Sequence, residues 1–250
     1  MKWIRTAIVF DKGELIDSPA WAKIHNGYRA AIKNLVHPSG TEKFTIRKKT
    51  RKMKDGKPTS QWWRNGVTPI KEQFLERLKT DGWIPEEPVS LREYFKSLSQ
   101  EDKDVQAILR TFPDKKGFTE TLRSSLGDFD FFMKTRSGFR AVIEWETGNI
   151  SSSHRSLNKL CLCLMAGQMD VGVLIVPSRA MYEHLTDRVG NWNELAPYLP
   201  YWNRVGAALV KKGLLAVTVV EHDRLTEDTS VPYISTKDDG NAARGAASLG

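Results

Sequence analysis

This chain has few cysteines, no long apolar runs and comparatively little negative charge. Its 250 residues include only two cysteines, Cys161 and Cys163, which lie two apart in a helical pattern and so point in different directions. This spacing argues against a disulfide or a metal pair, and we expect two buried thiols. No apolar run approaches the length that spans a bilayer, and the apolar part of residues 1–10 is too short for a signal peptide. We therefore expect a protein of the cytoplasm with no membrane partner.

The charge of the chain indicates a polyanionic partner. There are 38 Lys and Arg residues against 30 Asp and Glu residues, a formal net charge of +8, which favours nucleic acid or an anionic surface. Positive charge is densest in residues 43–57, which include Lys48, Lys49 and Arg51, and two tryptophans follow at 62–63. Such a run usually forms a solvated loop, but it can also contact phosphates. The sequence alone leaves both interpretations open.

Two acidic pairs are the strongest chemical signal in the chain. An apolar run ends in Glu144-Trp-Glu146, and in a strand this spacing places both glutamates on one face. Asp128 and Asp130 repeat the spacing upstream. Residues 134–138, a short polar connector that ends in glycine, predict a hairpin loop between the two strands. Pairing of the strands would gather the carboxylates at one end of a small sheet.

Such a gathering is unfavourable without a counter-charge. Two carboxylates about 4 Å apart repel by roughly 4 kcal/mol at an effective dielectric constant of about 20. Either one of them takes a proton or a cation lies between them. Oxygen ligands favour a hard divalent ion such as magnesium. The alternative is a solvated sheet face, on which the acids repel one another weakly through water.

The order of predicted elements indicates a mixed α/β fold, with a central sheet flanked by helices. The continuous apolar run at 171–177 predicts a strand buried on both faces, and another strand is predicted at 214–221. Helices are predicted at 18–35, 68–81, 90–98, 101–112, 118–126, 151–167, 178–186 and 191–199, with a rigid linker at 84–88. We expect one domain over 1–233, made of a helix and basic loop in 1–67 and a core in 68–222, followed by a disordered tail at 234–250.

An α-β-β-α-β core that carries Asp and then Glu-x-Glu is the pattern of the PD-(D/E)xK nuclease superfamily. The chain resembles one branch of it, the type II restriction endonucleases of the BamHI and BglII kind. The run from Glu144 to Asn149 matches that branch's Glu-x-Glu-Phe-Gly-Asn element in type and spacing. Ser151 and Arg155 match a serine and an arginine that enter the DNA groove, and Asp187-Arg188 lies as far downstream as the base-reading pair. The resemblance covers about residues 68–205.

The resemblance implies a type II site-specific deoxyribonuclease that hydrolyses phosphodiester bonds in double-stranded DNA with magnesium as cofactor. Asp130 and Glu144 would be metal ligands. Glu146 stands where the superfamily usually has lysine, and it would act as general base or position the attacking water. Two points stay open: Asp128 shares a face with Asp130 and could replace it, and Glu120 is either a further acid of the site or a plain surface glutamate.

The resemblance also implies partners. Asn149, Ser151, Arg155, Asp187 and Arg188 would contact DNA; the alternatives are a cap for Asn149, a solvent-facing residue for Arg155 and a local ion pair for Asp187 and Arg188. The resemblance suggests a six-base palindrome around GATC, such as GGATCC, as the recognition site. A palindromic site implies a two-fold homodimer and a cognate DNA methyltransferase. The helix at 151–167 would form part of the dimer interface. Two other functions remain: a repair or structure-selective nuclease, and a non-enzymatic DNA-binding protein.

Overall fold

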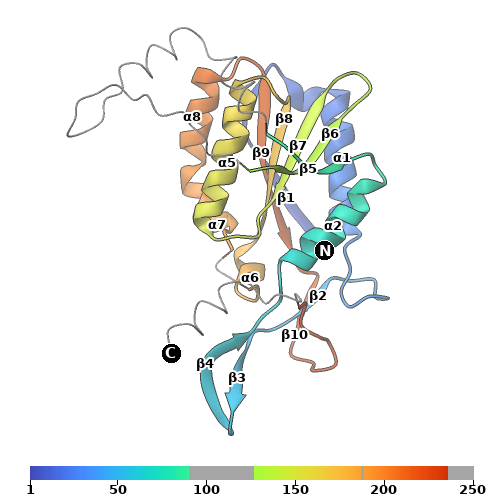
Figure 1. The fold of residues 1–250 in the computed structure, drawn as a ribbon, viewed down its shortest axis with the longest axis vertical. Coiled ribbons are helices and arrows are strands. Elements are labelled where there is room, and N and C mark those ends of the chain that lie inside the picture. The colour runs from blue at the N-terminus through green and yellow to red at the C-terminus, as the bar shows by residue number, and fades with distance from the viewer. Residues whose placement is uncertain (90–126, 187–188, 236–250) are drawn as a thin grey trace, which may run out of the picture.

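The chain folds around a six-stranded mixed sheet with helices on both faces (Figure 1). A computed structural model describes residues 1–89, 127–186 and 189–235. The strand order is β1-β9-β8-β7-β6-β5. The two central pairings, β9 with β8 and β8 with β7, are parallel, and the three outer pairings are antiparallel. The predicted mixed α/β class is confirmed.

The order of the strands places the acidic hairpin of β6 and β7 between β8, which is parallel to β7, and the short edge strand β5, which is antiparallel to β6. Short 3-10 turns at Leu15–Asp17 and Ala196–Tyr198 join the longer elements. The elements are β1 (Lys2–Lys12), α1 (Pro19–Lys33), β2 (Thr45–Arg47), β3 (Thr50–Lys54), β4 (Lys57–Trp63), α2 (Thr68–Lys79), β5 (Ile84–Glu87), β6 (Phe129–Lys134), β7 (Arg140–Trp145), α5 (Ile150–Met165), β8 (Val171–Pro177), α6 (Arg179–Tyr182), α7 (Trp192–Leu195), α8 (Leu199–Leu209), β9 (Gly213–Glu221) and β10 (Arg224–Thr226).

Local sequence signals determine several of these elements. Ser18 caps α1, its hydroxyl accepting the Trp21 N–H at 3.1 Å, and Pro19 takes the first helical position. β8 is buried along its whole length, as its apolar run predicts. β6 and β7 form the predicted antiparallel hairpin. α5 begins one residue earlier than predicted, because the Asn149 side chain caps it by accepting the Ser152 N–H at 3.2 Å.

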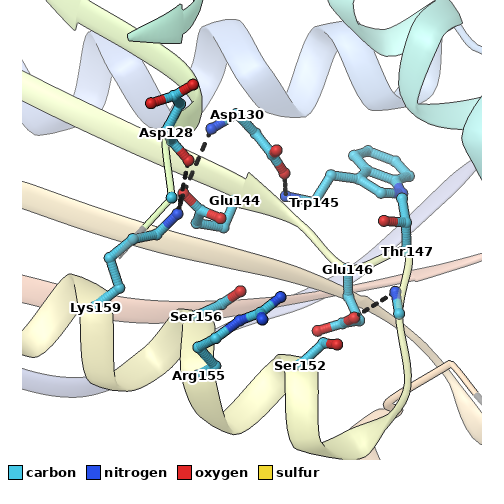
Figure 2. A pocket seen from close by; sticks show the side chains of 12 residues that line it. Asp128, Asp130, Glu144, Trp145, Glu146, Thr147, Ser152, Arg155, Ser156 and Lys159 are labelled. Atoms are coloured by element: carbon cyan, nitrogen blue, oxygen red, sulfur yellow. Dashed lines mark hydrogen bonds and ion pairs between the residues drawn. The ribbon is translucent and has the colours of Figure 1, made fainter. Parts of the chain in front are cut away.

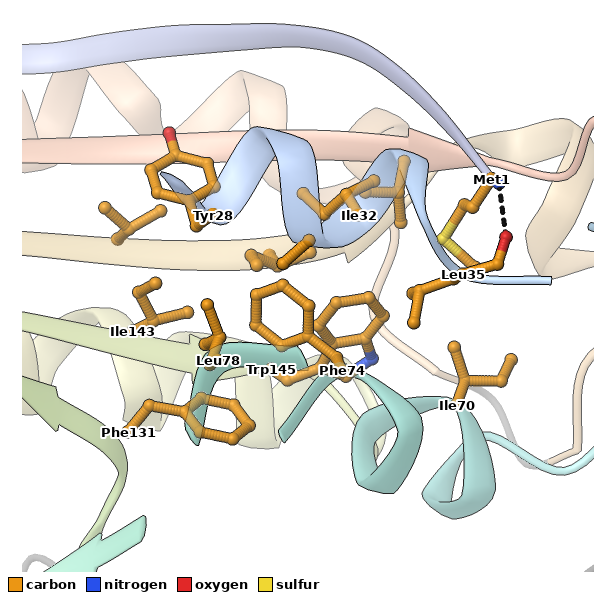
Figure 3. Close-up of a cluster of buried hydrophobic side chains, with 14 of the residues drawn as sticks. Met1, Tyr28, Ile32, Leu35, Ile70, Phe74, Leu78, Phe131, Ile143 and Trp145 are labelled. Carbon is orange, nitrogen blue, oxygen red and sulfur yellow. Dashed lines mark hydrogen bonds between the residues drawn. The ribbon is translucent and has the colours of Figure 1, made fainter. Parts of the chain in front are cut away.

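Two hydrophobic cores hold the layers together. On one face of the sheet α1 and α2 pack in a cluster that contains Phe74, Phe131 and Trp145 (Figure 3). The ring centroid of Phe74 lies 4.7 Å from that of Trp145 and 5.3 Å from that of Phe131. On the other face α5 and α8 pack over β8 and β9, and Cys161 and Cys163 lie there as buried free thiols. Burial raises the pKa of each thiol to about 12, so both are the inert core residues that the sequence predicted.

Three predictions about local structure are wrong. The linker at 84–88 is the edge strand β5, a position that tolerates Pro85. The basic run at 43–57 is not a solvated loop: it forms β2, β3 and part of β4, and β3 pairs with β4 as a separate two-stranded hairpin. Residues 1–67 are more than a helix and a loop, because β1 pairs with β9 in the central sheet. α8 and β10 were also not predicted. The helices predicted at 90–98, 101–112 and 118–126 lie outside the described residues.

The contact of Phe74 with Trp145 gives a test of the core beneath the acidic strand. Replacing Phe74 with Ala should lower the free energy of unfolding by about 3–5 kcal/mol, because a fully buried ring is lost and a cavity remains. Urea denaturation followed by tryptophan fluorescence would measure this loss. The matched control is Glu76→Ala, an exposed position on the same helix. Equal stability of the two variants would contradict the packing described here.

Candidate active site

A pocket of about 430 Å³ opens where β6 and β7 separate (Figure 2). The paired register of the two strands runs from the hairpin loop as far as Phe131 and Ile143. Beyond that pair the Asp130 carboxylate lies between the strands and accepts the Trp145 N–H at 2.8 Å. The pocket is lined by the ends of both strands and by the first turns of α5. It brings the four acids of the two sequence pairs, Asp128, Asp130, Glu144 and Glu146, to one place.

Glu144 is the most constrained of these acids. It is 5% exposed and lies on β7, with its Oε1 atom 2.8 Å from the Lys159 Nζ atom of α5. The Asp130 N–H donates to the same oxygen at 3.4 Å. Burial raises the pKa of Glu144 to about 7, the negative charge of Asp130 adds to the rise, and Lys159 opposes it. The proton affinity of this group is therefore high even with an ammonium beside it.

Glu146 follows β7 directly and is also buried, at 3% exposure. Its Oε1 atom accepts the Gly148 N–H at 2.7 Å. Its Oε2 atom is buried without a hydrogen-bond partner among the described residues. Burial raises the pKa of Glu146 to about 7; the Ser153 hydroxyl and the Gly148 N–H oppose the rise, and the charges of Asp130 and Glu144 add to it. A carboxylate with an unpartnered buried oxygen has capacity for a proton, a water molecule or a cation.

The two upstream aspartates differ in their surroundings. Asp130 is partly buried, and its second oxygen pairs with the Lys71 Nζ atom of α2 at 2.5 Å. Asp128 is exposed, and it is its backbone carbonyl, not its carboxylate, that accepts a hydrogen bond from Lys159 at 2.8 Å. Only Asp130 is tied by hydrogen bonds to β7, so the geometry favours Asp130 over Asp128 as the partner of Glu144.

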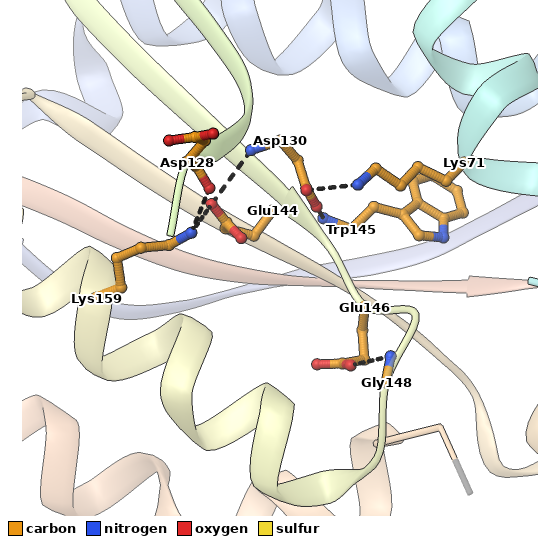
Figure 4. Close-up of polar contacts among 8 residues, drawn as sticks. All are labelled: Lys71, Asp128, Asp130, Glu144, Trp145, Glu146, Gly148 and Lys159. Carbon is orange, nitrogen blue, oxygen red and sulfur yellow. Dashed lines mark hydrogen bonds and ion pairs between the residues drawn. The ribbon is translucent and has the colours of Figure 1, made fainter. Parts of the chain in front are cut away.

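The sequence analysis missed two lysines of the site. Lys71 comes from α2 on one side of the sheet, and Lys159 comes from α5 on the other (Figure 4). Lys159 is 5% exposed and belongs to the buried face of α5, between Leu157 and Leu160. A lysine within an apolar helical stripe is the signal that would have identified Lys159, because a buried ammonium needs an anion close by.

The donor set of the pocket fits a hard divalent cation. Its acids offer only oxygen ligands, their negative charge is concentrated in a buried place, and one buried oxygen of Glu146 has no partner. Within residues 1–89, 127–186 and 189–235, no three His, Cys, Asp or Glu side chains already form a metal cage. Each of the three buried or half-buried carboxylates instead turns to a partner of its own: Lys71, Lys159 or the Gly148 amide (Figure 4).

Residues predicted to contact DNA lie beside this pocket. Asn149, Ser151 and Arg155 are exposed at the start of α5, and Arg155 also lines the pocket. Asn149 has the capping role that was the alternative to base contact. Asp187 and Arg188 lie outside the described residues, as does Glu120. Val189 forms an isolated β-bridge with Asn149, so residue 189 lies next to the start of α5.

The basic hairpin of β3 and β4 projects away from the sheet (Figure 1). The Trp62 ring lies under two cations, with its centroid 5.7 Å from the Lys49 Nζ atom and 4.5 Å from the Arg51 Cζ atom. Lys48 forms an exposed ion pair with Glu227 at 2.7 Å. Lys49 and Arg51 are thus held against Trp62, and Lys48 is paired with an acid, rather than carried on a loose loop.

A buried asparagine ties the base of this hairpin to the rest of the molecule. Asn65 is fully buried, and its side-chain amide donates to the carbonyls of Arg47 and His184 at 2.8 and 2.9 Å. Its side-chain oxygen accepts the Ile234 N–H at 3.3 Å, and its backbone carbonyl accepts the Thr186 N–H at 2.7 Å. Asn65 therefore connects the strand before the hairpin, the loop after α6 and the segment that follows β10.

Comparison with known proteins places this geometry among restriction enzymes. The family described as "Restriction endonuclease BamHI" matches residues 1–241. The type II restriction enzyme OkrAI of Oceanobacter kriegii is 33% identical over 244 residues, which cover 98% of this chain and 100% of the relative. The type II restriction enzyme BamHI of Bacillus amyloliquefaciens is 30% identical over 175 residues, 70% of this chain and 66% of the relative. The crystal structure of restriction endonuclease BglII complexed with a DNA 16-mer shares the fold, with a TM-score of 0.53 and 10% identity over 88% of this chain and 78% of that one.

The raised pKa of Glu146 predicts how stability depends on pH. Between its ordinary value of 4.5 and about 7, the folded protein holds a proton that the unfolded chain has lost, so the free energy of unfolding falls as the pH rises. Glu146→Gln removes this group. The variant should be more stable than the unchanged protein by about 1–3 kcal/mol at pH 8, with the difference closing toward pH 4.5. Urea denaturation in EDTA across this range would measure it, with the exposed Glu76→Gln as control. A difference that does not vary with pH would contradict the prediction.

Proposed function

Because this chain belongs to the BamHI family of restriction endonucleases, we propose that it cleaves double-stranded DNA at a short palindromic sequence with magnesium as cofactor. Family membership makes it a site-specific endonuclease. The observation that supports magnesium-dependent cleavage at a short palindrome is the arrangement of acids at the carboxyl end of β7. There, two buried glutamates and Asp130 line one pocket that opens beside exposed, DNA-facing candidates on α5.

In this proposal Asp130 and Glu144 hold the magnesium ion. When bound, the ion supplies positive charge to the scissile phosphate and to the attacking water. Glu146 is the general base: its pKa of about 7 lies near a neutral working pH, and its Oε2 atom has no competing partner among the described residues. Its other oxygen is held by the Gly148 amide, which orients the carboxylate toward the pocket. Glu120 stays a candidate for a further acid of the site.

Contacts to DNA divide into two groups in this proposal. In one group, Arg155, Asn149, Ser151, Asp187 and Arg188 reach base edges or the nearby backbone. Lys48, Lys49 and Arg51 contact phosphates from the basic hairpin. The hairpin supports this role because its cations are exposed or stacked on Trp62, in a chain with a net charge of +8. The match of the base-contact residues to the BamHI pattern favours a six-base palindrome around GATC, such as GGATCC.

A palindromic site cut on both strands requires two active sites related by two-fold symmetry, so we propose a homodimer. The surface beside α5 supports this: Tyr198, Tyr201 and Leu209 are 51%, 62% and 51% exposed on the 3-10 turn and on α8, and His154 of α5 packs on Tyr198.

No helix among the described residues is long and apolar enough to cross a membrane. We propose that the enzyme is one domain over residues 1–233, that it acts on DNA in the cytoplasm, and that a methyltransferase of the same specificity protects the host DNA.

The two alternative functions are less well supported. A non-enzymatic DNA-binding protein disagrees with membership of an enzyme family. A repair or structure-selective nuclease would use the same acids, but the relatives that match over most of this chain are type II restriction enzymes. Plasmid digestion separates a restriction enzyme from a repair or structure-selective nuclease, because a restriction enzyme yields discrete fragments.

Removing a metal ligand should abolish cleavage without abolishing DNA binding. Glu144→Ala and Asp130→Asn should show no plasmid cleavage in magnesium, whereas Asp128→Asn, the matched control two residues away, should keep measurable activity. Gel-shift assays in EDTA should show that all three variants still bind DNA, because these residues contact the ion and not the duplex. Cleavage by the unchanged protein in excess EDTA would refute the metal assignment, and activity in Asp130→Asn but not in Asp128→Asn would reverse the choice of aspartate.

Base contacts and phosphate contacts should respond differently to substitution. Arg155→Ala should lose about 1–3 kcal/mol of discrimination between cognate and random duplexes, because a base contact is removed. Lys49→Ala should weaken binding to both duplexes equally and lower the salt slope by about one unit, because a phosphate contact is removed. Fluorescence anisotropy at several salt concentrations would measure both effects. If both variants weaken the two duplexes by the same factor, Arg155 belongs to the general cationic surface.

A further inference from the structure

Three of the four acids of the pocket, Asp130, Glu144 and Glu146, each turn toward different partners (Figure 4). Asp130 faces Lys71 and the Trp145 amide, Glu144 faces Lys159, and Glu146 faces the Gly148 amide. Two of these four partners are ammonium groups. The negative charge that would attract a metal ion is therefore already partly balanced by the protein itself.

Lys159 is held in the pocket far more firmly than Lys71. The side chains of Lys159 and Glu144 are each 6% exposed, against 28% and 20% for Lys71 and Asp130. The Lys159 Nζ atom also donates to the Asp128 carbonyl at 2.8 Å and lies 5.5 Å from the centroid of the Phe129 ring. A buried ammonium is stable only when paired and hydrogen-bonded, and these contacts meet that need.

We propose that Lys159 is the resident counter-ion of the metal site, which a divalent ion must displace from Glu144 in order to bind. The inference rests on the proposed role of Glu144 as a metal ligand. The ammonium lies 2.8 Å from Oε1 of Glu144, so it occupies that oxygen and repels any second cation placed there. The Asp128 carbonyl gives the ammonium an acceptor that remains after displacement. Lys159 is thus a positioning residue, which holds the Glu144 side chain in place until the metal arrives.

Metal binding to the full chain without DNA tests this role directly. Isothermal titration with Mn²⁺ at pH 8.5 would compare the unchanged protein with Lys159→Met, which removes the charge, and Lys159→Arg, which keeps it. Lys159→Met should bind Mn²⁺ at least about tenfold more tightly. A nearby opposite charge changes the proton affinity of a carboxylate by about tenfold or more, and we expect an effect of the same size on cation affinity. Lys159→Arg should match the unchanged protein. Lys71→Met should show a smaller gain, because its ion pair is more exposed to solvent.

The matched control is Lys79→Met, which removes a lysine from an exposed pair with Glu76 and should leave Mn²⁺ affinity unchanged. If Lys159→Met does not fold, as judged by its thermal melt, Lys159→Gln makes the same comparison with an amide that can still donate to the Asp128 carbonyl. If the variant without the charge binds Mn²⁺ no more tightly than the unchanged protein does, the proposal is overturned.

Plasmid cleavage by the unchanged protein separates this proposal from the proposed function. Cleavage together with unaltered Mn²⁺ affinity in Lys159→Met would leave the nuclease assignment in place and reject the counter-ion role. Tighter Mn²⁺ binding in Lys159→Met without cleavage by the unchanged protein would reject the nuclease assignment and support competition between the lysine and the metal ion.

Discussion

The burial of Trp145 against Phe74 is the constraint on which the site depends. The indole lies in the core on the side of α1 and α2, and strand alternation then directs the residues on either side of it toward α5. Glu144 and Glu146 therefore reach the same pocket, although both would be better solvated elsewhere. The hydrophobic free energy of the aromatic cluster offsets the desolvation of the two carboxylates, so packing on one face of the sheet maintains the unfavourable electrostatics on the other.

The two faces of the sheet also supply the charges that make this burial tolerable. Lys71 reaches Asp130 from α2, and Lys159 reaches Glu144 from α5, so each helix layer contributes one cation to the end of the acidic hairpin. Glu146 has no such cation among the described residues and relies on the Gly148 amide and the nearby Ser153 hydroxyl. This asymmetry distinguishes the three acids: Asp130 and Glu144 each have an ammonium partner, whereas Glu146 has no ammonium partner among the described residues and keeps one buried oxygen without a hydrogen bond.

Local patterns in the sequence predicted the parts of the fold that depend on neighbours in the chain. The cap at Ser18, the buried run of β8 and the alternation in β6 and β7 are examples. β1 was not predicted because its partner, β9, lies about 200 residues away in the chain and its own pattern is short and partly polar. The basic hairpin was read as a loop because both of its faces are polar, which hides strand alternation. The acids of the site were predicted from spacing, but Lys71 and Lys159 come from separate helices, and only the three-dimensional packing brings them to those acids.

Asn65 has a consequence for how the molecule could change over evolutionary time. It binds the strand before the basic hairpin, the loop after α6 and the segment after β10 with one buried amide and its own backbone. These three surface segments are therefore not independent modules that can be exchanged one at a time. An altered hairpin that shifted Arg47 would leave a buried amide unsatisfied and would disturb the segment around His184 and Thr186, so the hairpin proposed to contact phosphates and the loop after α6 cannot change independently. New specificities in such a scaffold would arise by concerted changes in all three segments.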